Sequence, residues 1–190
     1  MNPSPTANQL GGRAVGSIFF TGFGSLWLFL ALYAKEQLSV ATVSGVALAT
    51  LLLVLAAMHL RRVARRFPRL PDDPATGRAF GWINAIQWIA VAVAAFTLAK
   101  LNLDAYVMNA ITAIVGLHMF PLARVFRYPV HYATGGALVA WAVFAGLLVP
   151  IEQMQGVTAL GTGIILWLSA AVTLVLALKI ARQPALAQSI

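Results

Sequence analysis

Four polar residues in the middle of the chain have the side chains of a small-solute binding site. Asn84 and Gln87 are three residues apart, so they share one face of a helix. His118 and Arg124 lie in the next apolar run, "NAITAIVGLHMFPLARVFRYP" at 109–129. Amides, an imidazole and a guanidinium can hydrogen-bond to a neutral or anionic molecule. We therefore expect Asn84, Gln87 and His118 to contact a ligand, with Arg124 attracting it electrostatically at the mouth of the site.

The helices that carry these residues place three of them at one depth. Counted from Arg78 at about 1.5 Å per residue, Asn84 and Gln87 lie about 9 and 13 Å along their helix. His118 lies about 9 Å from Arg124 along the following helix, which runs in the opposite direction. A short turn joins the two helices, so we expect antiparallel neighbours. Ionisable residues inside membrane helices are functional candidates by default, and this favours a solute site.

Pro121 supports a structural alternative for the same residues. A proline inside a helix leaves the carbonyl four residues earlier, here that of Leu117, without its usual donor. In lipid that carbonyl needs another partner, and the side-chain amide of Asn84 or Gln87 could supply it. The sequence leaves both interpretations open: a solute site, or a repair of the helix break at Pro121.

The elements that position these residues must be membrane helices, because the chain is too apolar for water. Of its 190 residues, 61% are hydrophobic and 9% are charged, whereas soluble domains carry about 25% charged residues. A helix needs about 20 apolar residues to cross a bilayer. We expect an all-α bundle of six transmembrane helices, in which residues 1–190 form a single integral membrane domain. The expected spans are 14–33, 40–60, 79–99, 105–126, 132–150 and 157–178.

The basic residues predict the orientation of the bundle. Of the 13 lysines and arginines, Lys35 and Lys100 flank one side and all the others flank the opposite side. Such an excess is typical of the cytoplasmic side, so we expect a bacterial inner-membrane protein with both termini in the cytoplasm. The net charge of +8 then needs no nucleic-acid partner. The loop at 61–78 begins with five arginines that can set topology and attract anionic lipid headgroups: Arg61, Arg62, Arg65, Arg66 and Arg69.

Short phrases recur where pairs of helices are expected to end. At the basic side they read "RRFP" at 65–68, "FRYP" at 126–129 and "ARQP" at 181–184. At the other side they read "AKEQL" at 34–38 and "AKLNL" at 99–103. Three hairpin repeats would explain both sets. Proline and basic residues also end helices for general reasons, so this alternative stays open.

Small and hydroxyl residues recur on single faces of several spans. Helices in lipid associate through close contacts between such residues and through modest hydrogen bonds, so we expect these faces to touch other helices. A hydroxyl-lined solute path would show the same pattern. The residues are Ser17, Thr21 and Ser25; Ala41, Gly45 and Ala49; Gly136 and Ala140; and Thr158, Thr162, Ser169 and Thr173.

Residues for most catalytic centres are missing or scattered. The absence of cysteine excludes disulfides and thiolate chemistry. The 5 acidic residues lie outside the expected spans, which disfavours a carboxylate-driven antiporter and Mg²⁺-dependent phosphotransfer. His59 and His131 are expected at the headgroup level, on the same rim as His118 but with no carboxylate near them. We therefore expect no metal, no cofactor and no catalytic residue, and an enzyme is the least favoured class.

The phrase "GLHMFPLARVFRYP" resembles a segment of short six-span bacterial membrane proteins, and this resemblance implies no particular activity. Chain length and span number are similar to the substrate-binding subunits of energy-coupling vitamin transporters. Those subunits have an alanine-x-x-x-alanine docking face in the first span, where this chain has Ser17, Thr21 and Ser25. The favoured function is binding or transport of a small polar solute. The alternative is a membrane scaffold or accessory subunit of a larger complex, including such a transporter subunit, and a homo-oligomer is compatible with either.

Overall fold

The computed structural model describes residues 5–71 and 73–182, and every regular element in these ranges is helical. Six long helices are joined by short connections, and a single 3-10 turn, η1 (Asp104–Tyr106), precedes the fourth. Each expected span overlaps one of these helices, and each helix is long and apolar enough to cross a membrane. The six-helix prediction is therefore confirmed. The helices are α1 (Ala7–Ala34), α2 (Val40–Ala64), α3 (Pro74–Lys100), α4 (Val107–Val125), α5 (Val130–Leu148) and α6 (Ile151–Arg182).

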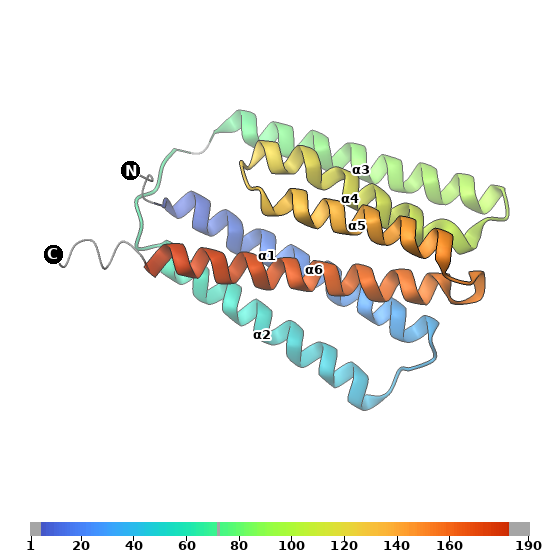
Figure 1. Ribbon diagram of the computed structural model, residues 1–190. Helices are drawn as coiled ribbons and strands as arrows, with labels where there is room; N and C mark the ends of the chain where they lie inside the picture. The colour runs from blue at the N-terminus through green and yellow to red at the C-terminus, as the bar shows by residue number, and fades with distance from the viewer. Residues whose placement is uncertain (1–4, 72, 183–190) are drawn as a thin grey trace.

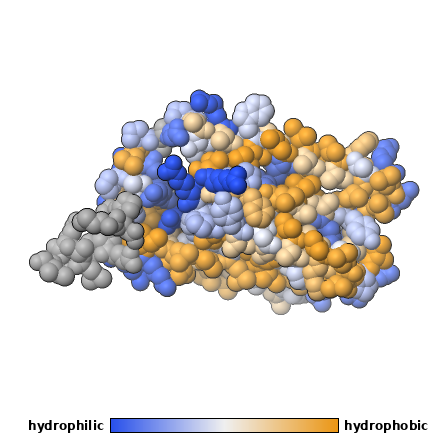
Figure 2. Space-filling model, turned by 45° about the horizontal axis from the view of Figure 1, so that its top comes forward, coloured by the Kyte–Doolittle hydropathy of each residue, from blue (hydrophilic) through white to orange (hydrophobic). Residues whose placement is uncertain are grey.

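Successive helices run in opposite directions, so the start of α1 and the end of α6 lie at the same end of the bundle (Figure 1). We call this end, with the connections at 65–73 and 126–129, the basic end. The connections at 35–39, 101–106 and 149–150 form the far end. Hydrophilic residues gather toward the basic end and, in smaller number, at the far end, while apolar residues cover much of the surface between them (Figure 2). This distribution fits a bundle that lies in a bilayer.

Helices α1 and α6 form the centre of the bundle, with α2 on one side and α3, α4 and α5 on the other (Figure 1). One apolar core joins α1, α4, α5 and α6, and a second joins α1, α2 and α6 near the basic end. Helix α3 has no buried residue, and α2 has buried residues only in its last part. Side chains such as Leu52, Trp82 and Phe96 are therefore available to lipid.

Two glycine pairs allow the closest helix contacts. A Cβ atom on Gly163 of α6 would lie 2.9 Å from the carbonyl oxygen of Gly24 on α1. A Cβ atom on Gly135 of α5 would lie 2.6 Å from the carbonyl oxygen of Gly116 on α4. Side chains cannot be added at such distances without separating the backbones. These crossings explain why α1 packs more extensively on α6 than on α2, and α5 more extensively on α4 than on α6.

The small-residue faces are only partly used in this packing. The hydroxyl residues expected to touch other helices on α1 and α6 are all buried: Ser17, Thr21, Ser25, Thr158, Thr162, Ser169 and Thr173. The prediction was wrong for most of these residues in the other two spans. Ala41 and Gly45 are exposed and Ala49 is half-buried, because the first half of α2 has no buried residue. Gly136 and Ala140 are exposed because α5 packs through the adjacent face of Gly135 and Leu138.

Three helices end in the same way. The residue after the helix cap has a left-handed backbone in α1 (Glu36, φ 55°), α3 (Asn102, φ 56°) and α4 (Arg127, φ 47°). The next N–H group in each case donates back to a carbonyl of the last turn, at 2.9, 2.9 and 3.0 Å respectively. This is the Schellman arrangement, which usually has glycine at the left-handed position. The turns of the first two expected hairpins, α1–α2 and α3–α4, thus share a geometry that the third does not, because α5 ends at Val149 in an extended backbone. Internal repetition stays a prediction.

Candidate functional site: a buried histidine cluster

The structure places the predicted ligand residues on neighbouring helices, because α3 packs against α4. Asn84 donates through Nδ2 to the Phe80 carbonyl of its own helix at 2.9 Å. Gln87 is half-buried, and its Oε1 has no hydrogen-bond partner. Both ring nitrogens of His118 are buried without a partner, whereas Arg124 is exposed. The assembly of these four residues into one ligand site stays a prediction.

Pro121 leaves α4 intact in the structure. The helix continues from Val107 to Val125, and Pro121 is on an exposed face. Within the part of the chain that the structure describes, no hydrogen bond links Asn84 or Gln87 to the Leu117 carbonyl. The geometry therefore gives no support to a repair role for these two amides.

A second histidine and a tyrosine join His118 at the basic end. His131, in the first turn of α5, lies at the same end of the bundle as His118, on the helix that packs against α4. The His131 ring makes edge-to-face contact with Tyr128 at a centroid distance of 5.2 Å and with Phe20 of α1 at 5.7 Å. We name His118, Tyr128 and His131 the histidine cluster. It lies where α1, α4 and α5 meet. The ring centroid of Phe126 is 6.3 Å from that of His131.

The turn between α4 and α5 positions two members of this cluster. Arg127 adopts its left-handed conformation, and Tyr128 N–H donates to the Ala123 carbonyl at 3.0 Å. The reversal buries the Tyr128 ring, which is only 8% exposed. The Arg13 guanidinium of α1 lies over that ring, 4.8 Å from its centroid. Pro129 cannot extend α4, and α5 begins immediately after it with His131 in its first turn.

Polar atoms of the histidine cluster have no hydrogen-bond partners. These atoms are Tyr128 Oη, His131 Nδ1 and both nitrogens of His118. Buried polar groups in folded proteins are nearly always paired, and leaving one unpaired costs roughly 1–3 kcal/mol. Together the hydroxyl and the rings can both donate and accept hydrogen bonds. With Arg13 at its wall and no acidic residue in the described helices near it, the cluster is suited to a neutral or anionic polar group.

A second polar group lies closer to the far end and is fully paired. Asn109 of α4 donates to the Ala142 carbonyl of α5 at 3.0 Å and accepts from Thr158 Oγ1 of α6 at 2.7 Å. Thr112 and Thr162 share a hydrogen bond of 2.9 Å between α4 and α6. We name these four side chains the Asn109 network. Thr158 and Thr162 were expected to touch other helices, whereas Asn109 and Thr112, which have the same kind of helical spacing, were missed in the sequence.

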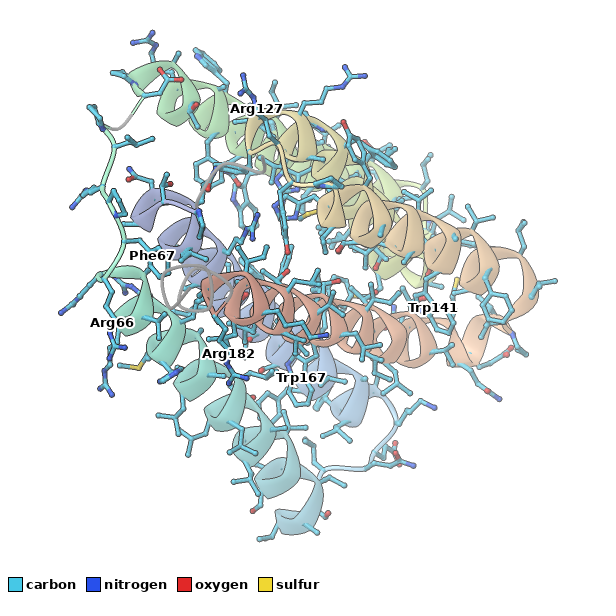
Figure 3. The ribbon with its side chains drawn as sticks, turned by 60° about the vertical axis from the view of Figure 1, so that its left-hand side comes forward. Arg66, Phe67, Arg127, Trp141, Trp167 and Arg182 are labelled. Carbon is cyan, nitrogen blue, oxygen red and sulfur yellow. The ribbon has the colours of Figure 1, made fainter. Side chains whose placement is uncertain are left out.

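The hydroxyl residues of α1 also have partners. Ser17, Thr21 and Ser25 each donate to the carbonyl four residues earlier. Trp167 of α6 donates to Ser25 Oγ at 3.2 Å, and its position beside α1 is visible in Figure 3. Trp141 similarly connects α5 with the Thr158 carbonyl at 3.2 Å (Figure 3). The two tryptophan bonds join helices of the same chain, and the hydroxyl bonds of α1 are made within that helix, which together favour the structural interpretation over a hydroxyl-lined path.

Metal ligands are not grouped in residues 5–71 and 73–182. No three His, Cys, Asp or Glu side chains in these ranges lie close enough to hold an ion. His59 is exposed on α2, away from the histidine cluster. Asp73, outside the spans, caps α3: its carboxylate accepts from Ala75 N–H and Thr76 Oγ1, both at 2.9 Å. The Ala75 bond is the main reason that the pKa of Asp73 lies below its ordinary value.

The fold and its apolar exterior define a class, the multi-pass α-helical membrane proteins. Comparison of the chain with protein families, curated proteins and solved structures finds no match. Function must therefore be argued from the histidine cluster itself.

Proposed function

We propose that the protein binds a small polar molecule, neutral or anionic, at the histidine cluster. The observation that carries this proposal is the concentration of unpaired polar atoms on His118, Tyr128 and His131. The Asn109 network shows that this bundle can satisfy buried polar side chains elsewhere. A ligand that donates to one ring nitrogen and accepts from the Tyr128 hydroxyl would give these atoms the hydrogen-bond partners that they lack.

The surrounding residues support the proposed charge of the ligand. Arg13 lies against the Tyr128 ring, and Arg124 and Arg127 are exposed at the same end of α4. Positive charge beside a low-dielectric site attracts anions and repels cations. Gln87, on the helix that packs against α4, offers a further buried amide oxygen.

We further propose that this end of the bundle faces the cytoplasm of a bacterial cell. The support is the distribution of the 13 basic residues, of which only Lys35 and Lys100 are at the far end. The proposed site lies about two helical turns from that surface, so we expect a solute to reach it from the cytoplasm. Binding there would be one step of transport, or the whole of a binding function.

Native mass spectrometry of the full chain, released gently from its own membrane, tests the proposal. We expect a bound small molecule that is retained in Tyr132→Phe and lost in Tyr128→Phe. Tyr128 Oη has no partner in the protein, so its removal breaks no internal hydrogen bond. Loss of one hydrogen bond to the ligand should weaken binding about ten-fold. Tyr132 is 40% exposed and makes the matched control.

Two results would overturn the proposal. A small molecule that binds equally to wild type, Tyr128→Phe and His118→Ala would be bound elsewhere. A stoichiometric protein partner with no small molecule would instead support a scaffold or accessory subunit.

A further inference from the structure

The connection after α2 is held against the start of α1. Ala7 N–H donates to the Pro68 carbonyl at 3.0 Å, and Leu70 N–H donates to Asn8 Oδ1 at 2.9 Å. These bonds join segments 62 residues apart in the sequence. They fix the backbone on both sides of Arg69.

Apolar packing also holds the connection after α2 in place. Phe67 is half-buried and packs against the apolar core that contains Leu10, Leu60 and Leu174. The N–H groups of Arg66 and Phe67 continue the last turn of α2 by donating to carbonyls three residues earlier, at 3.0 and 3.1 Å. The segment is therefore attached by packing, by helical bonds and by the two bonds to α1.

This attached segment presents a group of arginines to the outside. All five are exposed, and we name them the arginine platform: Arg61, Arg62, Arg65, Arg66 and Arg69. Arg61 and Arg62 lie in the last turn of α2, and Arg65 and Arg66 follow in the turn that continues it beyond Ala64. In the described part of the chain, the first four have no ion-pair partner. Figure 3 shows Arg66 and, from α6, Arg182 near Phe67 at this end.

Membrane topology requires positive charge but not a fixed arrangement of that charge. Like charges held side by side repel one another, and the repulsion is relieved only by an anion. Guanidinium groups bind phosphate oxygens in pairs, with defined geometry. The fixed backbone beneath the arginines therefore indicates a phosphate group at a defined place, beside the membrane surface.

We propose that the arginine platform is a preformed site for the headgroup phosphate of an anionic phospholipid. The bonds to Ala7 and Asn8 hold the site in shape. This proposal is independent of the histidine cluster, because the two sites share no residue.

The test separates charge from arrangement in the full-length protein. Each variant is reconstituted in vesicles of phosphatidylglycerol and phosphatidylcholine and extracted gently, and native mass spectrometry measures the ratio of the two lipids retained. We expect Arg66→Gln to lower this ratio roughly five-fold. Arg78→Gln removes one exposed charge from α3 at the same end, and we expect less than a two-fold change. Asn8→Ala keeps every charge but removes one tether, and it should lower the ratio at least two-fold.

The proposal would be overturned if wild type and Asn8→Ala retained the two lipids in the same ratio and if Arg66→Gln and Arg78→Gln lowered that ratio equally. Lipid selection would then depend on net charge alone and not on the arrangement of the arginines. Release of phosphatidylglycerol by inorganic phosphate at matched ionic strength would also overturn it, because the site would then take a soluble anion. Circular dichroism of each variant checks that the helices are retained, and Asn8→Gln, with a longer amide, should recover part of the ratio.

Discussion

The Asn109 network and the histidine cluster are two polar groups that both include residues of α4. The side chains of the first have hydrogen-bond partners on other helices, and those of the second do not. In the network, Asn109 both donates and accepts, across three helices, and it is 7% exposed. In the cluster, His118 has two buried nitrogens and no hydrogen-bond partner on another helix. Polarity inside a membrane helix therefore does not by itself mark a functional residue. A buried polar residue that already has hydrogen-bond partners on other helices joins those helices, whereas one that lacks such partners is available to a ligand.

The two regions should also contribute to stability with opposite signs. Hydrogen bonds between membrane helices stabilise the fold by about 0.6 kcal/mol on average and up to about 1.7 kcal/mol. An unpaired buried group destabilises the fold by roughly 1–3 kcal/mol. The unliganded protein is therefore held together at the network and weakened at the cluster.

The largest expected effect is at the network. Asn109→Leu removes two interhelical hydrogen bonds and leaves Thr158 Oγ1 without its acceptor. We expect the free energy of unfolding to fall by about 2–3 kcal/mol, measured by reversible unfolding in mixed detergent micelles. Asn84→Leu is the control, because it removes only a bond within α3, and it should change the value by less than about 0.5 kcal/mol. Equal losses in the two variants would contradict the assignment of Asn109 as an interhelical link.

At the histidine cluster we expect a smaller change in the free energy of unfolding, and an increase instead of a decrease. His118→Leu removes two buried ring nitrogens and breaks no hydrogen bond to another helix, because the one backbone interaction of the ring, with Val115, lies within α4. We expect the unliganded protein to gain about 1 kcal/mol, since an apolar side chain replaces an unsatisfied polar one. The same unfolding assay measures it beside Asn109→Leu. A loss as large as that of Asn109→Leu would mean that His118 has a structural partner, and the comparison between the two regions would fail.

The sequence predicted those features that depend on one helix at a time. The spans follow from local hydropathy, and the adjacency of α3 and α4 follows from the short turn between them. Asn109 was missed because its acceptor and donor, Ala142 and Thr158, lie 33 and 49 residues away. Such a pair is visible only when the neighbours of α4 are known.

The histidine cluster was predicted only in part for the same reason. His118 was identified from its place in an apolar run, but His131 was assigned to the headgroup level. In the structure the half-buried ring of His131 contacts Phe20 of α1, which is distant in the sequence. The burial of Tyr128 depends on the left-handed backbone of Arg127. No local pattern predicts that conformation for an arginine.

The smallest expected effect tests this dependence on Arg127. The Asn109 network is built on regular helices, whereas the cluster needs one residue in a conformation unfavourable for L-amino acids with a side chain. Arg127→Gly and Arg127→Ala remove the same charge and differ mainly in their tolerance of φ 47°. We expect the glycine variant to be more stable than the alanine variant by roughly 0.5–1 kcal/mol. The glycine variant should also keep ligand binding at the cluster, because it preserves the turn that buries Tyr128. Equal stability of the two variants would show that the turn does not constrain Arg127, and the burial of Tyr128 would then need another cause, such as the contact with Arg13.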